Sequence, residues 1–377
     1  MDFNVLKAFM NGIVNDPFLL LIVIASIIII LVVIVWITKM VIDISPYAYV
    51  NARVRSREGK LLDKSKISEL IEAGSLEEMI GLLGDTEYSK YLANARDVLE
   101  VEKALNECLA DLYKFLYNVS PNKAKEVLKI LMMKFDIKNI KTLIRAKRAG
   151  LSPEETYKLL IPAGTLPIEK LKELCEMETP EEIVRGLEGT EYFKVLQNTT
   201  SPMDMELSLD KYYLEKLRKA LMIEGKEEDI FREFFGTLID IENLKVILKA
   251  KADGLSGEEI AKYIVPGYEL PDWKLKELAG AGGIEGIISG LEGTSYSQLL
   301  GEALDEYNKV KSIYVFEKVL DKYILDKGRN LSLRKPFSVG PIIGLIVSKE
   351  LEIKNLKAII KGKVENLKPE EIKSLLI

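Results

Sequence analysis

Three glutamates have the residue type and spacing that could support acid–base chemistry. Glu102, Glu206 and Glu317 each begin the pattern Glu-x-x-Leu, which is followed by Asn or Asp. A catalytic pair of carboxylates needs two different environments in one asymmetric arrangement. A glutamate that recurs at a matched place in each repeat is more typical of contacts between helices or with a partner. We therefore interpret the three as contact residues, with an enzyme that uses repeated acidic residues as the less favoured alternative.

Three lysines recur in the same manner and could bind an acidic partner. Lys147, Lys251 and Lys363 end the segments ArgAlaLys, LysAlaLys and LysGlyLys. A ring of ammonium groups would attract an acidic surface. A solvated helix face is nevertheless the favoured interpretation, and contact with an acidic partner is the alternative.

Other kinds of site chemistry have no matching motif. The chain has no histidine and two cysteines, Cys108 and Cys175, which we expect to be buried thiols. It lacks the phosphate-binding pattern G-x-x-x-x-G-K-[ST], and the GlyAlaGlyGly segment at Gly280 lies between helical segments. Its net charge is −5, and acidic and basic residues are interleaved along the chain. This pattern does not indicate a basic surface for nucleic acid. We predict no catalytic residue, no cofactor, no metal ion and no nucleic-acid partner.

The elements that carry these residues repeat along the chain. Gly-Leu-Glu-Gly-Thr-x-Tyr motifs place Thr86, Thr190 and Thr294 at intervals of 104 residues, the first in a variant form. We expect these threonines to cap helices. A second motif begins at residues 137, 241 and 353, and a GluGlu pair follows it in each copy.

The second motif is helical in its periodicity. Apolar residues recur at spacings of three and four, and Gly150 and Gly254 stop the helices before the first two GluGlu pairs. Its asparagines, Asn139, Asn243 and Asn355, are expected to satisfy a buried helix or loop group. No alternating strand pattern accompanies these helices, so we predict an all-α fold.

The order of the motifs gives a domain organisation. Residues 137–240 and 241–352 each hold a full unit, while 45–136 and 353–377 together make the first unit. Closure of one unit by both chain ends favours a ring or funnel of three similar helical domains with pseudo-three-fold symmetry. An open solenoid would instead carry polar caps at its ends.

Residues 1–44 form a tail with a predicted transmembrane helix. From Phe18 to Ile37 there is no charge, glycine or proline, and a helix of that length matches the hydrocarbon thickness of a bilayer. Asp16 and Pro17 form a helix start, and Trp36 suits the membrane interface. A cleaved signal peptide is the alternative, but no small-x-small site follows the apolar run.

The charges beside this helix predict its orientation. Only Lys7 precedes the span, whereas five basic residues follow it: Lys39, Arg53, Arg55, Arg57 and Lys60. The positive-inside rule therefore places the chain in the cell membrane with the large C-terminal body on the cytoplasmic side.

Three features together resemble the C subunit of the archaeal and bacterial A/V-type rotary ATPases, a family similar to the d subunit of eukaryotic vacuolar pumps. They are the segment TyrAlaTyrValAsnAlaArgValArgSerArgGluGlyLysLeuLeu from Tyr47 to Leu62, the Asn-Leu-Lys helix ending in Arg/Lys-Ala-Lys, and the IleProAlaGlyThrLeuPro loop at Ile161. The resemblance covers the chain from about residue 45 onward and does not include the apolar segment.

The resemblance implies a funnel of three helical domains and a non-catalytic role. A protein of this family is implied to sit in the central stalk, on the proteolipid rotor ring, and to hold the D and F subunits of the shaft. It would couple proton or sodium transport through the membrane to ATP synthesis or hydrolysis. A membrane-anchored helical scaffold unrelated to ATPases remains the alternative.

Overall fold

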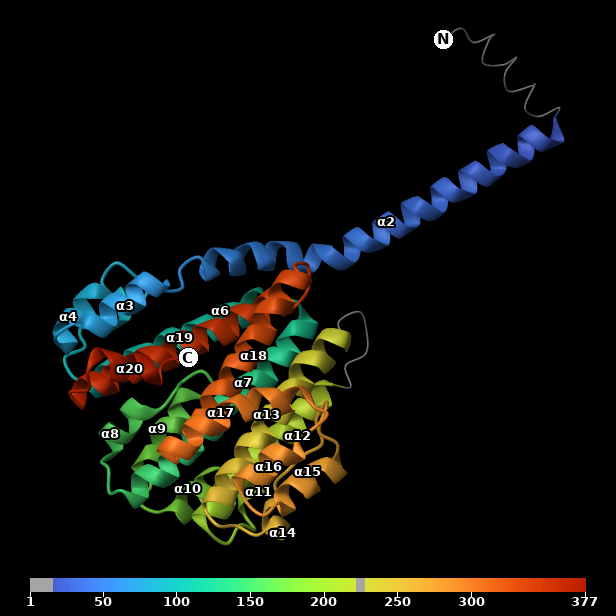
Figure 1. Cartoon of the computed structure of the whole chain (residues 1–377). Helices are drawn as coiled ribbons and strands as arrows, with labels where there is room; N and C mark the ends of the chain where they lie inside the picture. The colour runs from blue at the N-terminus through green and yellow to red at the C-terminus, as the bar shows by residue number, and fades with distance from the viewer. Residues whose placement is uncertain (1–15, 222–227) are drawn as a thin grey trace. The chain divides into compact units, whose positions relative to one another are not determined.

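The computed structural model of the protein describes residues 16–221 and 228–377, and within these ranges it contains helices and no strand, which confirms the all-α class (Figure 1). The chain divides into two compact units, Met1–Val50 and Asn51–Ile377. The two units are described separately below.

The N-terminal unit contains the apolar part of α2 (Pro17–Glu58). The helix begins at Pro17 as predicted, and Asp16 Oδ1 accepts hydrogen bonds from the backbone N–H groups of Phe18 at 2.9 Å and Leu19 at 3.3 Å. Most large apolar side chains between residues 18 and 42 are exposed. Within the described part of the chain, α2 is the one helix that is long and apolar enough to cross a membrane, judged by length and composition alone.

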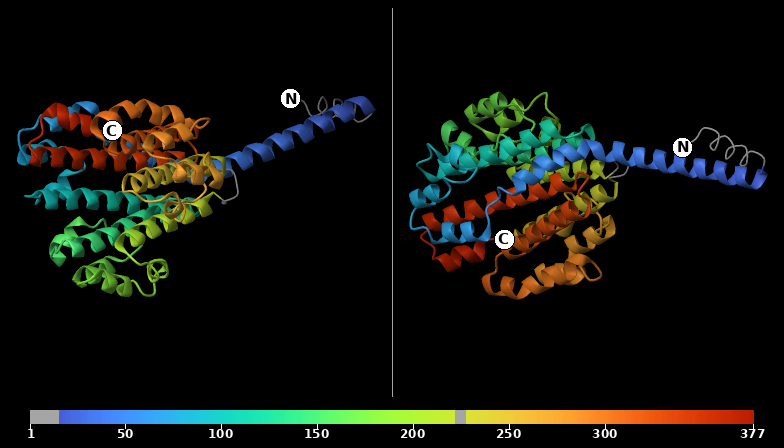
Figure 2. Two further views of the ribbon diagram at one scale, coloured as in Figure 1. Left: turned by 60° about the horizontal axis from the view of Figure 1, so that its bottom comes forward. Right: turned by 90° about the horizontal axis from the view of Figure 1, so that it is seen from above.

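Six long helices form the framework of the second unit. They contact one another in the cyclic order α6, α7, α12, α13, α18, α19 and back to α6, so that the contacts close a ring. Figure 2 shows these helices from two further directions. Their bounds are α6 (Val98–Val119), α7 (Asn122–Arg148), α12 (Pro202–Ala220), α13 (Glu228–Ala252), α18 (Tyr314–Arg334) and α19 (Gly340–Val364).

Short helices fill the chain between the long ones, and their bounds repeat. Two sets recur at intervals of 104 residues: α3 (Lys64–Glu72), α9 (Ile168–Glu176) and α15 (Asp272–Gly280), then α4 (Leu76–Leu82), α10 (Pro180–Gly186) and α16 (Ile284–Gly290). The remaining ones are α5 (Ser89–Leu92), α8 (Pro153–Leu159), α11 (Glu191–Leu196), α14 (Gly257–Ile260), α17 (Ser295–Val310) and α20 (Pro369–Leu375). The sequence repeat is therefore also a repeat of secondary structure.

Helix starts in each repeat are capped by side chains. Ser152 accepts a hydrogen bond from the backbone of Glu155, whose carboxylate binds the Ser152 N–H in return, and Ser256 and Glu259 form the same capping box. Each box satisfies two backbone donors that the first turn leaves without partners. The GluGlu pairs of the sequence thus start α8 and α14.

Apolar clusters hold the short helices against the long ones. One cluster packs around α7 and includes Leu174 and Tyr192, and the other packs around α13 and includes Leu278 and Tyr296, residues that lie 104 positions later. Cys108 and Cys175 are both buried and unpaired, as predicted. Burying each large apolar side chain stabilises the fold by about 1.5–3 kcal/mol.

Candidate functional site

An asparagine on each of α7, α13 and α19 holds the chain that follows the helix. The Asn139 side chain donates to the carbonyl oxygen of Ile161 and accepts from its N–H group, both at 2.8 Å. Asn243 and Asn355 bind the residue 22 positions later in the same way, at distances of 2.5–3.1 Å. The expectation that these amides satisfy a buried loop group is therefore confirmed.

A carboxylate lies three residues before each asparagine and organises the adjoining loop. Asp136 is fully buried and accepts hydrogen bonds from the N–H groups of Thr165 at 2.7 Å and Leu166 at 3.0 Å, and from the Tyr192 hydroxyl at 2.9 Å. A β-carbon on Gly164 would lie 1.9 Å from an Asp136 oxygen, so the glycine leaves room for the carboxylate. This contact explains the IleProAlaGlyThrLeuPro loop in physical terms.

The other two repeats use the same arrangement. Asp240 accepts from the Tyr296 hydroxyl at 3.1 Å and from three successive backbone N–H groups, beginning with Tyr268 at 3.1 Å. Glu352 accepts from the Tyr88 hydroxyl at 2.6 Å. Helices α7, α13 and α19 are therefore each tied to the tyrosine of a Thr-x-Tyr motif.

Sequence reasoning missed these three carboxylates, although a signal for them was present. Asp136, Asp240 and Glu352 all stand in the pattern acidic-Ile-x-Asn. The asparagine in this pattern was recognised, but the acidic residue before it was not.

Of the three threonines, only Thr86 has a side chain that accepts a hydrogen bond from the backbone ahead, from the Tyr88 N–H group at 3.2 Å. Thr190 and Thr294 occupy the N-cap positions of α11 and α17, but neither makes a side-chain capping bond. Instead, the hydroxyl groups of Thr86, Thr190 and Thr294 each donate at 2.7 Å to the carbonyl oxygen three residues earlier. The prediction of side-chain capping was wrong for Thr190 and Thr294 because the preceding turn offers a carbonyl acceptor within reach of each hydroxyl.

The three predicted glutamates have different surroundings. Glu206 binds the guanidinium of Arg145, and although burial opposes its ionisation, this cation holds the pKa of Glu206 below its usual range. Glu206 and Glu317 line one cavity of about 460 Å³, whereas Glu102 is not among its lining residues. The structure therefore brings two of the three glutamates together. Their role as partner contacts stays a prediction.

Two of the three predicted lysines bind backbone carbonyl groups at helix ends. Lys147 donates to the carbonyl of Cys175 at the end of α9, and Lys363 donates to those of Ile71 and Ala73 at the end of α3. Lys251 is half-buried. The orphan carbonyls of a helix C-terminus attract such cations. Contact of these lysines with a partner stays a prediction.

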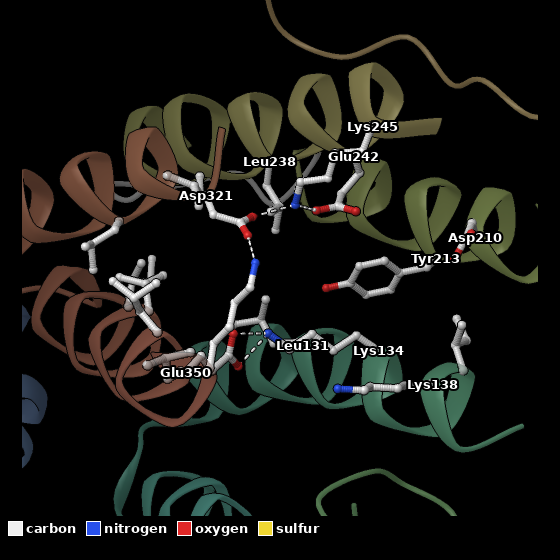
Figure 3. Close-up of a pocket in the computed structure, with 18 of the residues that line it drawn as sticks. Leu131, Lys134, Lys138, Asp210, Tyr213, Leu238, Glu242, Lys245, Asp321 and Glu350 are labelled. Carbon is white, nitrogen blue, oxygen red and sulfur yellow. Dashed lines mark hydrogen bonds and ion pairs between the residues drawn. The ribbon is translucent and has the colours of Figure 1, made fainter. Parts of the chain in front are cut away.

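Five helices of the ring, α7, α12, α13, α18 and α19, line a cavity of about 420 Å³ that contains apolar and charged side chains (Figure 3). Lys245 on α13 lies between Glu242 at 2.9 Å and Asp321 at 2.7 Å. Lys134 on α7 forms an ion pair with Glu350 on α19 at 2.5 Å. These side chains cross-link neighbouring helices around the cavity.

The ion pairs also set the charge states of their members. Burial opposes the charged form of Lys245, but Glu242 and Asp321 outweigh it and raise the pKa of Lys245. Burial likewise opposes ionisation of Asp321, but Lys245 and Lys354 lower its pKa. Lys245 and Asp321 are thus stably charged in the cavity wall. Among residues 16–221 and 228–377, no group of three or more Cys, Asp or Glu side chains could hold a metal ion.

Comparison with known proteins decides the family. Residues 50–375 match the family described as ATP synthase (C/AC39) subunit. The chain belongs to this family. It is 66% identical to the A-type ATP synthase C subunit of Methanocaldococcus jannaschii, over 100% of this chain and 98% of that relative. It is 43% identical to the A-type ATP synthase C subunit of Methanothermobacter thermautotrophicus, over 88% of this chain and 87% of that relative.

Membership of the C/AC39 family confirms the resemblance drawn from the sequence. The matched range begins near the TyrAlaTyrValAsnAlaArg segment and includes all three asparagine helices. It leaves out residues 1–49, which contain the apolar segment. The Methanocaldococcus relative, by contrast, is matched over the whole of this chain, apolar segment included.

Proposed function

We propose that this C/AC39 family member is a non-catalytic central-stalk subunit of an A-type ATP synthase. In this role the Asn51–Ile377 unit joins the proteolipid rotor ring to the D and F subunits of the shaft. Torque from proton or sodium transport then passes through it to the ATP-handling part of the complex. Its relatives carry the name of the C subunit of an A-type ATP synthase, which supports membership of such a complex.

The observation that carries the proposal is the closed ring of six helices, five of which line a cavity that contains charged side chains. A part that transmits torque must resist shear between its elements. Contacts that return from α19 to α6 leave no free end at which the ring could open. Half-buried ion pairs such as Lys245 with Asp321 join neighbouring helices, and removing one partner leaves the other charge partly desolvated without its counter-ion.

The division into domains forms part of this proposal. We assign residues 45–136 with 353–377, 137–240 and 241–352 to three similar units arranged as a funnel about a pseudo-three-fold axis. The repeated helix bounds and the repeated Asn139, Asn243 and Asn355 contacts support this assignment. Three similar walls around one axis would suit the grip on an elongated shaft.

The proposal places the apolar part of α2 in the membrane with the large unit on the cytoplasmic side. Exposed apolar side chains from Phe18 to Ile42 support membrane insertion because water would solvate them poorly. The excess of basic residues after the span supports the orientation. Lipid would then be a further partner of this chain.

Purification from native membranes tests the role. A tagged full-length chain extracted in mild detergent should co-elute with the proteolipid ring and with the D and F subunits. A membrane-anchored scaffold unrelated to ATPases would elute without them.

A cavity variant tests where the shaft binds. Leu238 lines the cavity, so Leu238→Lys should weaken binding of a purified D–F complex to the full-length chain. Leu333 is 71% exposed on α18, so the matched change Leu333→Lys should leave that binding unchanged. Equal binding of both variants would contradict a shaft site in this cavity.

A further inference from the structure

One lysine–acid contact recurs in the repeats, but its third copy lacks the acid. Lys141 on α7 binds Asp210 on α12, and Lys245 on α13 binds Asp321 on α18. At the matching place on α19, Lys357 donates to the amide oxygen of Asn106 on α6 at 2.5 Å. A neutral amide thus holds Lys357 in position without neutralising its charge.

A second lysine beside it also lacks a counter-ion. Lys138 on α7 makes no hydrogen bond or ion pair with any residue that the structure describes, and the residue as a whole is exposed. Figure 3 shows its amine without a bonded neighbour, in contrast to Lys134 and Lys245. The matching residue on α13 is Glu242. Helix α7 therefore carries a positive charge at the place where α13 carries a negative one.

Lys138 and Lys357 line the same cavity, which has a volume of about 420 Å³. Its charged lining consists of these two, Lys134, Lys354 and Glu350. The other two lysines are already neutralised, because Lys134 pairs with Glu350 and Lys354 pairs with Asp321. The remaining lining includes apolar side chains, namely Leu109, Phe135, Ile161 and Ile353. Two positive charges therefore remain in a cavity with a partly apolar wall.

The ammonium groups of Lys138 and Lys357, neither of which is paired with a carboxylate, repel each other. Burial and repulsion from Lys138 together lower the pKa of Lys357 to about 8, although Glu102 on α6 partly opposes both. Burial also lowers the pKa of Lys138, where Glu350 and Glu102 favour the charged form and Lys134 and Lys354 disfavour it. Carboxylates of the protein thus leave this pair under-compensated. A bound anion would restore the balance.

We propose that this cavity, between Lys138 of α7 and Lys357 of α19, is a binding site for a small inorganic oxyanion of the phosphate class. Both ammonium groups donate to the anion, and Asn106 is a positioning residue that orients Lys357. Charge-assisted hydrogen bonds of this kind are about twice as strong as neutral ones. The cavity holds a tetrahedral oxyanion with attendant water. This proposal does not depend on the proposed rotor function.

Calorimetry of the full-length chain in detergent tests the site with inorganic phosphate as the probe. At pH 7 and constant ionic strength, phosphate should bind with one site per chain, and chloride should not replace it. Lys138→Gln and Lys357→Gln should each weaken binding about tenfold or more, because each removes one charged donor. Binding to the unaltered chain should also weaken above about pH 8, as Lys357 loses its proton.

Asn106→Asp is the decisive variant because it supplies the missing carboxylate. It should abolish phosphate binding while the protein stays folded, since the other repeats already carry a lysine–aspartate pair at this place. Asn118 is exposed on the same helix, so Asn118→Asp is the matched control and should bind phosphate normally. Absence of phosphate binding to the unaltered chain, or undiminished binding by Asn106→Asp, would overturn the proposal.

Discussion

The carboxylate of Glu352 accepts a hydrogen bond of 2.6 Å from the hydroxyl group of Tyr88, which stands 264 residues earlier in the chain. Glu352 also binds Lys349 at 2.7 Å, and both acidic and basic side chains are buried. Farther along α19, Lys363 binds carbonyl groups at the end of α3. Helix α19 is thus fastened to the first part of the Asn51–Ile377 unit by polar contacts.

Removing the Tyr88 hydroxyl should loosen the two ends of this unit together. Tyr88→Phe leaves buried Glu352 without one donor, so the free energy of unfolding should fall by about 1–3 kcal/mol. Hydrogen exchange should quicken in α3, α6 and α19. The matched variant Tyr296→Phe removes the corresponding bond to Asp240 and should quicken exchange in α13 to α17 instead. Identical exchange maps for both variants would refute this view of how the chain ends are joined.

Adding a methyl group at Gly164 should destabilise the loop that Asp136 holds. The new β-carbon would lie 1.9 Å from a carboxylate oxygen, and a buried carboxylate with several hydrogen bonds has little freedom to move. We expect Gly164→Ala to cost about 1–3 kcal/mol in urea unfolding. At Gly301, within α17, a β-carbon would meet nothing within 4 Å. Gly301→Ala should therefore stabilise the protein by about 0.5–1 kcal/mol; a loss there as large as at Gly164 would contradict the steric explanation.

Burial raises the pKa of Asp240 to about 6, although its backbone donors and the Tyr296 hydroxyl oppose the shift. The folded chain therefore binds this proton more tightly than the unfolded chain, whose aspartate has a pKa near 3.9. The stabilisation that the Asp240 carboxyl group provides is fully present below about pH 4. It is lost as the pH rises to about 6, and the free energy of unfolding falls by about 3 kcal/mol in all.

Urea unfolding at several pH values between 4 and 7 measures this effect. Asp240→Asn should remove the dependence, although the variant is less stable throughout because an amide accepts fewer of the backbone donors. Asp305→Asn alters an exposed residue of α17 and should keep the original pH profile. An unchanged profile in Asp240→Asn would show that other groups cause it.

Deleting residues 1–44 should release the protein from membranes. This change removes the exposed apolar stretch of α2, which is long enough to span the hydrocarbon layer. Washing with mild salt or chelator should then extract the shortened chain, whereas the full-length chain should require detergent. If washing also extracts the full-length chain, the apolar segment is not a membrane anchor, and the predicted orientation fails with it.

Charge reversal separates the two possible uses of the repeated lysines. Lys363→Glu places a negative charge beside the carbonyl groups of Ile71 and Ala73. Its main effect should therefore be a lower free energy of unfolding. Lys251→Glu is the informative variant for a partner surface. If this lysine faces an acidic partner, its reversal should weaken D–F binding strongly at low salt and less at high salt. Unaffected binding would leave Lys251 as part of a solvated helix face.

The helices were predictable because their signals are local. Asp16 and Pro17 mark the start of α2, and the Ser-Pro-Glu-Glu and Ser-Gly-Glu-Glu segments mark the starts of α8 and α14. A cap and its partner lie within one turn of each other, so neighbouring residues contain the whole interaction. The error at Thr190 and Thr294 has the same origin, because a hydroxyl can serve either the helix ahead or the turn behind.

The candidate site was largely beyond sequence reasoning because its partners are remote in the chain. Nothing near Lys245 in sequence reveals that Asp321 lies 2.7 Å away, and nothing near Lys357 reveals Asn106. Such a pair becomes visible only when two helices separated by a whole repeat are brought into contact. The lysines chosen by periodicity, Lys147 and Lys363, turned out to bind helix ends of the protein itself.

The sequence by itself determined the all-α class, the family and the 104-residue repeat, since each depends on residue types at fixed spacing along the chain. Tertiary structure decided which charges are cancelled. Lys141, Lys245 and Lys357 occupy the same place in their repeats, yet only the packing of α6 against α19 makes an asparagine the neighbour of the last one. A charge is defined by its residue type, but its compensation depends on distance in space, because Coulomb energy falls with separation and not with position along the chain.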